Sequence, residues 1–197
     1  MAECGATTKI LGEFSMNSEV PSDFNPNRFL GSLFDVAKAV LITPKTFFST
    51  MARQGPLIHP VLFLITSVVV HTLLARPFYQ MPGLVYQNLF MGITLPFLTA
   101  AIVFLLLTRL LNSSGTYEAT FRVNAYAAAV GLVSWIPVIG VFLELYRLYI
   151  IVVGLRAVYA IKTTRAIIAI FLTFIIYTAL FRMLFNVTGG QFMNLPG

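Results

Sequence analysis

The stretch that decides the fold runs from Leu57 to Ala75 and reads LIHPVLFLITSVVVHTLLA. It lies within a run of 22 residues, 54–75, that contains no Asp, Glu, Lys or Arg. A helix of about 20 residues rises about 30 Å, which is the thickness of the hydrocarbon core of a bilayer. The stretch therefore predicts a membrane-spanning helix.

The composition of the whole chain is also typical of a membrane protein. Of its 197 residues, 58% are hydrophobic and only 10% are charged, whereas about 25% are charged in an ordinary soluble domain. The formal net charge is +6, from 13 basic and 7 acidic side chains. In a membrane protein such an excess reports which loops are cytoplasmic, so we expect no nucleic-acid partner.

Two further stretches with few charges predict three more spans. Residues 77–108 are uncharged and exceed the length of one crossing, so we expect a turn followed by a second span over residues 88–108. Pro96 is expected to kink this span. Residues 123–161 divide at Pro137–Gly140 into a third and a fourth span, joined by a tight hairpin.

The last apolar stretch, residues 166–185, predicts a fifth span. Because no alternation typical of barrel strands is visible, helices must satisfy the backbone hydrogen bonds in lipid. The predicted fold is therefore all-α, a polytopic membrane helical bundle of five transmembrane helices. We assign this bundle to residues 54–186 and a short C-terminal tail to residues 187–197.

The N-terminal part has a different composition. Residues 1–26 are polar and predict a flexible tail, and residues 27–53 contain a cytoplasmic amphipathic helix that precedes the bundle. We expect this interfacial segment to lie on the inner leaflet; alternatively, its apolar face docks under the bundle or onto a protein partner. The residues expected to contact the membrane surface or a partner are Arg28, Phe34, Lys38, Lys45, Phe47, Phe48 and Arg53.

The distribution of Lys and Arg predicts the orientation. With a cytoplasmic N-terminus, ten basic residues fall on the cytoplasmic side and two on the other side. This count places Arg109 and Arg122 in a cytoplasmic connection and leaves Arg147 out as intramembrane. We therefore expect the N-terminus in the cytoplasm, the C-terminus outside, and anionic lipid headgroups as partners of the basic loops.

Three blocks of this sequence resemble the Yip domain (Ypt-interacting protein) family of membrane proteins. They are LITPKTFFSTMARQGPLIHPVLF at residues 41–63, GTYEATFRVNAYA at residues 115–127, and VVGLRAVYAIKTTRAI at residues 152–167. The resemblance covers residues 40–186 and implies a five-helix protein with a cytoplasmic N-terminus. The residues that carry the family-like motif are Thr120, Phe121, Arg122, Tyr126, Gly154, Leu155 and Arg156.

The resemblance also carries expectations about function and location. Eukaryotic members of the family are associated with small GTPases and with vesicle traffic between endoplasmic reticulum and Golgi, and prokaryotic members share the fold. The short tail and brief loops of this chain favour a prokaryotic inner (plasma) membrane over a eukaryotic endoplasmic reticulum or Golgi membrane.

Charged residues inside the fourth span indicate a candidate intramembrane site. Glu144 and Arg147 share one helix face, and a charge in lipid is costly unless it faces the bundle or a partner. Arg182, near the outer end of the fifth span, is a second candidate partner for Glu144. The group is either an ion- or substrate-contacting site or an interhelical clamp whose charges neutralise one another. The other candidate members are His71, Tyr146 and Tyr149.

No arrangement in the sequence predicts catalysis. His71 has no second metal ligand at suitable spacing on its span, and no Ser or Cys has an evident base. No Gly-rich phosphate loop follows a strand either. We therefore expect no catalytic residue, no metal and no cofactor.

Two functions remain. The favoured one is a non-enzymatic integral membrane scaffold or adaptor of the Yip type, in membrane organisation or trafficking. The alternative is a small transporter or channel for an ion, a small molecule or a lipid, with an intramembrane Glu/Arg site. A water-accessible cavity at Glu144 favours transport, whereas a sealed ion pair favours the scaffold. The sequence leaves open a protein partner at the N-terminal segment and a homo-oligomer.

Overall fold

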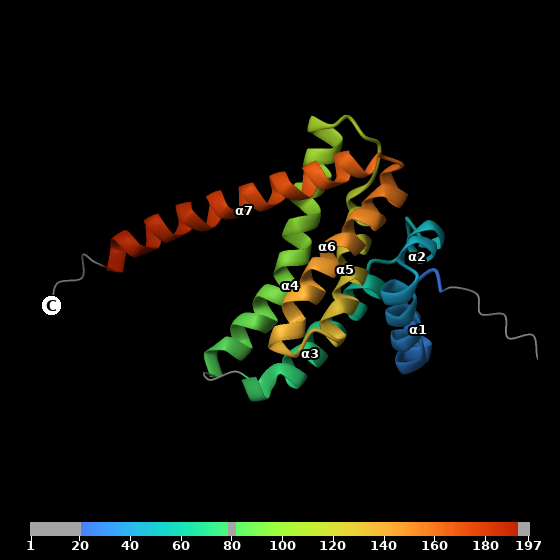
Figure 1. Ribbon diagram of the computed structural model, residues 1–197, viewed down its shortest axis with the longest axis horizontal. Helices are drawn as coiled ribbons and strands as arrows, with labels where there is room; N and C mark the ends of the chain where they lie inside the picture. Colours follow the sequence, from blue (N-terminus) through green and yellow to red (C-terminus); the bar gives the residue numbers. More distant parts are fainter. Residues whose placement is uncertain (1–20, 79–81, 193–197) are drawn as a thin grey trace, which may run out of the picture.

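The computed structural model describes residues 21–78 and 82–192, and every regular element in these ranges is helical. Most of the expected N-terminal tail, residues 1–20, lies outside the described ranges, as do residues 193–197. Figure 1 shows a bundle of helices with two short helices on one flank and one long helix that extends away from it.

Three short elements open the described part of the chain. They are η1 (Pro26–Arg28), α1 (Phe29–Ile42) and α2 (Pro44–Thr50). Pro44 separates the two α-helices, because proline is favoured at the first position of a helix but cannot continue the preceding one.

Four long helices have the length and composition to cross a membrane. Their apolar segments are Ile58–Phe78, Gly83–Leu110, Val138–Tyr159 and Thr163–Met183. They belong to α3 (Ile58–Ala75) with η2 (Arg76–Phe78), α4 (Pro82–Leu105) with the π-helical η3 (Leu106–Leu110), α6 (Pro137–Tyr159) and α7 (Thr163–Phe192). The long helices thus include the first, second, fourth and fifth expected spans.

The expected third span differs from the others. It consists of α5 (Tyr117–Ala127), which Thr116 caps by accepting a hydrogen bond from the Ala119 N–H, and the 3-10 helix η4 (Ala128–Leu132). Every residue from Ala119 to Val130 is buried, because α5 packs against α3, α4 and α6. The structure therefore contains four long apolar helices in its described ranges and a short internal helix among them.

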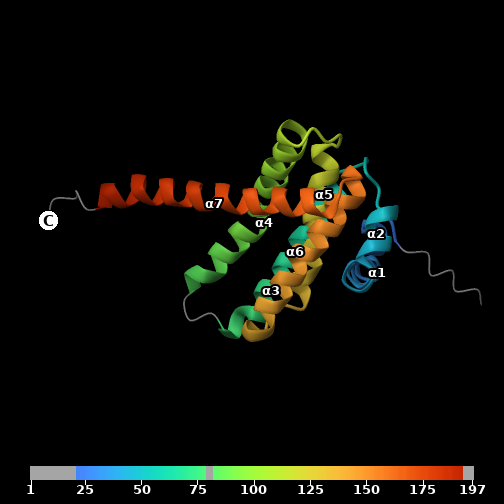
Figure 2. The same cartoon turned by 45° about the horizontal axis from the view of Figure 1, so that its top comes forward.

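The two ends of α6 are set by local chemistry. Pro137 occupies its first turn, as the expected hairpin requires, and Ala160 ends the helix in the left-handed conformation, with φ 50°. After this turn α7 crosses α4 and then leaves the bundle at a steep angle, so that its C-terminal half stands apart in both Figure 1 and Figure 2.

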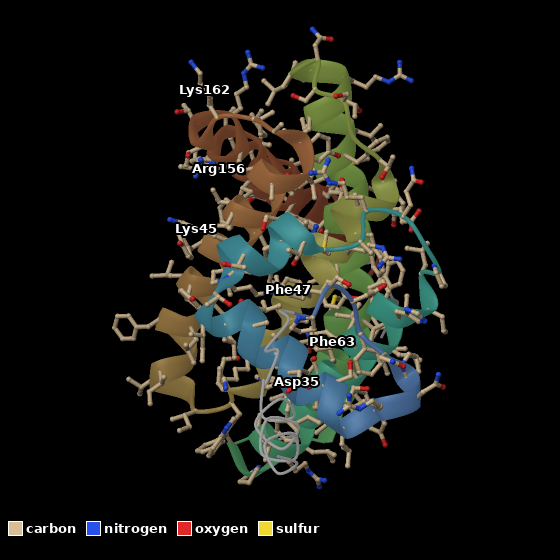
Figure 3. The ribbon with its side chains drawn as sticks, turned by 90° about the vertical axis from the view of Figure 1, so that its right-hand side faces the viewer. Asp35, Lys45, Phe47, Phe63, Arg156 and Lys162 are labelled. Carbon is tan, nitrogen blue, oxygen red and sulfur yellow. The ribbon has the colours of Figure 1, made fainter. Side chains whose placement is uncertain are left out.

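Helices α1 and α2 pack against the bundle, mainly against α5, η4 and α6 (Figure 3). Val36 and Val40 of α1 are fully buried, and the opposite face exposes Phe34, at 70% of its surface. This arrangement corresponds to the docking alternative, and the buried face cannot lie on the inner leaflet. Phe47 and Phe48 are 0% and 1% exposed, so they are core residues and do not contact the membrane surface or a partner as expected.

Candidate functional site

A buried arginine lies at the centre of the contact between the N-terminal segment and the bundle. Arg122 of α5 is fully buried, although the sequence suggested a connecting loop for it. Its Nη1 donates to Asp23 Oδ2 at 2.8 Å, and its Nη2 donates to the Pro56 carbonyl at 3.2 Å and to Glu118 Oε1 at 3.3 Å. One guanidinium thus joins three segments of the chain.

Two further side chains complete this ionic cluster. His59 Nδ1 lies 3.4 Å from Asp23 Oδ2, and Tyr126 donates its hydroxyl proton to Asp23 Oδ1. The same Tyr126 oxygen accepts a hydrogen bond from the Phe24 N–H at 3.2 Å. The carboxylate of Asp23 is therefore held by three side chains, and this fixes the start of the described chain on the bundle.

Apolar and aromatic groups enclose the cluster. The ring of Tyr126 lies 5.2 Å from the rings of both Phe47 and Phe63, in edge-to-face geometry, and Phe24 lies 5.9 Å from Phe63. The Arg122 side chain itself has no exposed surface, and this burial strengthens its charged hydrogen bonds.

Four of the five remaining family-like residues also make internal contacts. Thr120 and Tyr159 share a hydrogen bond of 2.6 Å between their hydroxyls, and Phe121 and Leu155 are fully buried. At Gly154 a Cβ would lie 2.5 Å from a Val123 methyl group, so the glycine permits α6 to approach α5. Arg156 alone of the seven is exposed.

The second polar site lies on α6. Arg147 Nη1 donates to Glu144 Oε2 at 3.5 Å, and their side chains are 31% and 54% exposed. Because both residues belong to one helix, this pair does not clamp two helices together. Arg182 is exposed on α7 and forms no ion pair with Glu144 in the described ranges, so the expected triad is not present.

Glu144 and Arg147 line two cavities. The first, of about 230 Å³, lies between α4, α5, α6 and α7, and its polar lining includes Thr99, Asn124 and Tyr177. The second, of about 120 Å³, lies between α3, α4, η4 and α6, and its polar lining is His71, Ser67, Asn88 and Ser134 together with the ion pair. The structure therefore brings His71 to the same cavity as Glu144 and Arg147.

The other two expected members face elsewhere. The Tyr146 hydroxyl donates to the Leu41 carbonyl of α1 at 2.6 Å, and the rings of Tyr146 and Tyr149 stack with centroids 5.6 Å apart. Tyr146 therefore helps to hold α1, and Tyr149 lines an apolar groove between α6 and α7.

Basic residues gather where α2 approaches the C-terminal end of α6. Lys45 and Arg156 line a cavity of about 430 Å³, and Arg53 Nη2 donates to the Ala157 carbonyl at 3.1 Å. Figure 3 shows Lys45, Arg156 and Lys162 along one edge of the molecule. We call these three residues the basic edge.

Comparison with protein families decides the relationship that the motif suggested. The Yip1 domain model matches residues 38–183, which is most of the chain. The chain belongs to the Yip1 domain family. Comparisons with curated proteins and with solved structures found no match.

Several residues at the two sites were not predicted from the sequence of this Yip1 domain. Most of them are partners of residues that were predicted. Asp23 lies 99 residues before Arg122 along the chain, and no local pattern links the two. Glu118 precedes Arg122 by four residues, a spacing typical of an ion pair on one helix, and could have been found. Ser67 and Ser134 are small hydroxyl residues in apolar surroundings, for which the sequence gives no signal.

Proposed function

We propose that the chain is a non-enzymatic membrane scaffold of the Yip1 type that presents the basic edge to the cytoplasmic surface of a membrane. The observation that carries this proposal is the attachment of the N-terminal segment. Asp23 is bonded to buried Arg122, and the apolar face of α1 and α2 is part of the core. Lys45 is thereby held beside Arg156, and the two side chains line one cavity.

The proposal includes a five-pass topology with a cytoplasmic N-terminus and an outer C-terminus. At 1.5 Å per α-helical residue and 2.0 Å per 3-10 residue, α5 and η4 together rise about 26 Å, nearly a bilayer core. Surrounded by the other helices, this pass needs no apolar surface of its own. Without the buried Arg122, nine basic residues against two support the orientation, and we propose a prokaryotic inner membrane as the location.

Anionic headgroups are the proposed partners of the basic edge. Each Lys or Arg near an anionic surface contributes about 1 kcal/mol of attraction. The exposed apolar side of α1, with Phe34, is proposed to contact acyl chains next to this edge. A protein partner with an acidic surface is the competing occupant.

The test neutralises the edge without removing the core. Deleting residues 1–53 would remove buried side chains such as Val36, so Lys45→Gln/Arg156→Gln is the better variant. The matched control is Arg76→Gln/Arg182→Gln, which removes the two exposed basic groups expected on the opposite side of the membrane. We expect the test variant in native membranes to lose co-purifying anionic lipid, and the control to retain it. Equal lipid retention by the two variants would refute the lipid-binding scaffold. If the test variant loses only crosslinked proteins and keeps its lipid, the partner of the basic edge is a protein.

One observation favours a second candidate function, a small transporter or channel. Glu144 and Arg147 are not sealed by their neighbours but line two cavities within the apolar helices. Flux of ions, small molecules or lipid into proteoliposomes, compared between the native chain and Glu144→Gln, tests this candidate. Identical flux in protein-free vesicles and in vesicles with the native chain would exclude it for the species tested.

A further inference from the structure

We infer that Glu144 and Arg147 bind the headgroup of one zwitterionic membrane amphiphile, whose tail lies in the groove between α6 and α7. This inference goes beyond the scaffold proposal and concerns binding alone, so it holds whether or not the chain transports anything. Four observations carry it: the state of the ion pair, the polar chamber behind it, the apolar groove beside it, and the depth of both in the bundle.

The ion pair has unused binding capacity. The 3.5 Å contact is at the limit of a hydrogen bond, and it is the one side-chain bond of Arg147 in the described ranges. A guanidinium carries five N–H donors and matches phosphate geometry, whereas a carboxylate accepts several bonds from an ammonium group. A positive and a negative group side by side complement a ligand that carries both charges. A purely anionic or cationic headgroup would meet one like charge.

The chamber behind the pair offers polar groups that lack partners. The hydroxyls of Ser67 and Ser134 are buried, at 0% and 7% residue exposure, and neither has a hydrogen-bond partner in the described part of the chain. His71 Nδ1 lies 2.9 Å from the Gly131 carbonyl, which can only accept, so neutral His71 leaves its Nε2 as an acceptor. Buried polar groups are normally satisfied, and rotation of these two serine side chains, which line the chamber, would bring their hydroxyls to a headgroup there.

The chamber is large enough for polar atoms of a ligand. Its volume of about 120 Å³ is several times the roughly 10–15 Å³ that one water needs by a comparable measure. Waters can share the chamber with the headgroup, because mixed donor and acceptor groups suit both.

An apolar groove continues from the ion pair. The cavity between α4 and α7 shares Leu148, Ile170 and Phe174 with a groove of about 340 Å³, which hydrophobic and aromatic side chains of α6 and α7 line. The groove lies between α6 and the N-terminal part of α7, where Phe171 and Phe174 are exposed, so a lipid can enter it from the side. A soluble zwitterion has no apolar surface to bury in such a groove, whereas an acyl chain does.

The order of these features along α6 fits one extended molecule. Glu144 and Arg147 lie about 10 and 15 Å from the start of α6, at 1.5 Å per residue. The groove residues Leu148 and Val152 follow them toward the C-terminal end of the helix. A bound amphiphile therefore has its headgroup nearer the start of α6, below the level of the membrane surface, and its tail nearer the opposite end.

Binding to the full-length protein in detergent tests the inference. The probes are a short-chain phosphoethanolamine lipid, a phosphoglycerol lipid of equal chain length with a net negative charge, soluble phosphoethanolamine, and a fatty alcohol. Native mass spectrometry counts bound molecules, and titration gives each Kd. For the native chain we expect one saturable site with the zwitterionic lipid at least about tenfold tighter than the other three probes, since charged hydrogen bonds are stronger than neutral ones.

Single-charge variants sharpen the test because they change the preferred headgroup. Glu144→Gln leaves Arg147, so the anionic lipid should bind better than the zwitterion, whereas Arg147→Gln should abolish the preference for any phospholipid over the alcohol. The exchange Glu144→Arg/Arg147→Glu keeps both charges and should keep the zwitterion preference. Arg165→Gln, exposed at the start of α7, is the control and should bind as the native chain does.

Each remaining outcome counts against the inference. If the native chain binds both lipids with equal affinity, or if both single variants keep the native selectivity, the ion pair is not part of the binding site. If soluble phosphoethanolamine binds as tightly as the lipid, the ligand is a small solute and not an amphiphile. If the fatty alcohol binds as tightly as the lipid, the site is only an apolar groove. A variant that unfolds in the same detergent is replaced by the charge-exchange variant, whose loss of selectivity would also overturn the inference.

Discussion

Replacing Arg122 by methionine tests whether the buried ionic cluster holds the N-terminal segment on the bundle. Methionine keeps much of the side-chain length in the enclosed site but removes the charge and every donor. Asp23 and Glu118 then lose their common partner, while their side chains keep only 20% and 28% contact with solvent. Breaking a buried ion pair costs about 3–5 kcal/mol. Because both carboxylates retain some contact with water, we expect about 3 kcal/mol, which is more than a hundredfold in the folding equilibrium.

The assay is equilibrium unfolding of the full chain in mixed detergent micelles, followed by circular dichroism, with Arg109→Met as the exposed control. Asp23→Asn and the double variant complete a double-mutant cycle, in which residues in direct contact show coupling of about 0.5–3 kcal/mol. Proteolysis near residues 21–28 should become faster in Arg122→Met, because the segment loses its attachment. An unfolding free energy within about 0.5 kcal/mol of the Arg109→Met value, together with zero coupling to Asp23, would refute the reasoning.

Three further predictions concern helix packing and the intramembrane site. Gly154→Ala places a methyl group 2.5 Å from a valine methyl on α5, so it should lower the unfolding free energy by about 1–3 kcal/mol. The control is Gly31→Ala, whose added methyl group meets nothing within 4 Å and should not destabilise the protein. Glu144→Gln should cost less than about 1 kcal/mol in a thermal unfolding series, because its ion pair is long and borders two cavities that can hold water. A cost near 3 kcal/mol would instead support a structural clamp. Ser67→Ala and Ser134→Ala should leave the unfolding free energy of the lipid-free protein unchanged or slightly raised, because each removes an unsatisfied hydroxyl. Both variants should bind the zwitterionic lipid more weakly. A large loss of stability would show that these hydroxyls have structural partners.

The sequence predicted the long helices because apolar length alone determines them. The runs that contain α3, α4 and α7 are almost free of charge, and Pro137 marks the start of α6 as the hairpin required. The sequence could not predict the burial of α5, because an apolar residue that faces protein and one that faces lipid look alike along the chain. For this reason Arg122 was counted with a connecting loop, although it lies at the centre of the fold.

The same limit explains the errors in the candidate sites. Amphipathic spacing indicated that α1 has an apolar face, but it could not decide whether lipid or protein covers that face, and Phe47 and Phe48 turned out to be core residues. Arg182 lies on the fifth expected span, yet it is exposed on α7 and forms no ion pair with Glu144 in the described ranges. Pairings of this kind depend on helix placement, which no local pattern encodes.

The two sites differ in whether the fold itself uses the charges. Arg122 has partners from three segments, so its cost of burial is offset by contacts that close the structure. Arg147 has one long contact on its own helix, and its position within an apolar span carries a cost that this contact hardly reduces. Two of the seven family-like motif residues, Arg122 and Tyr126, belong to the first site, and four others are buried in helix contacts, so most of the Yip1 motif serves closure of the bundle. The presence of Arg147 in this span is therefore not explained by contacts within the fold. A ligand bound at Glu144 and Arg147 explains it.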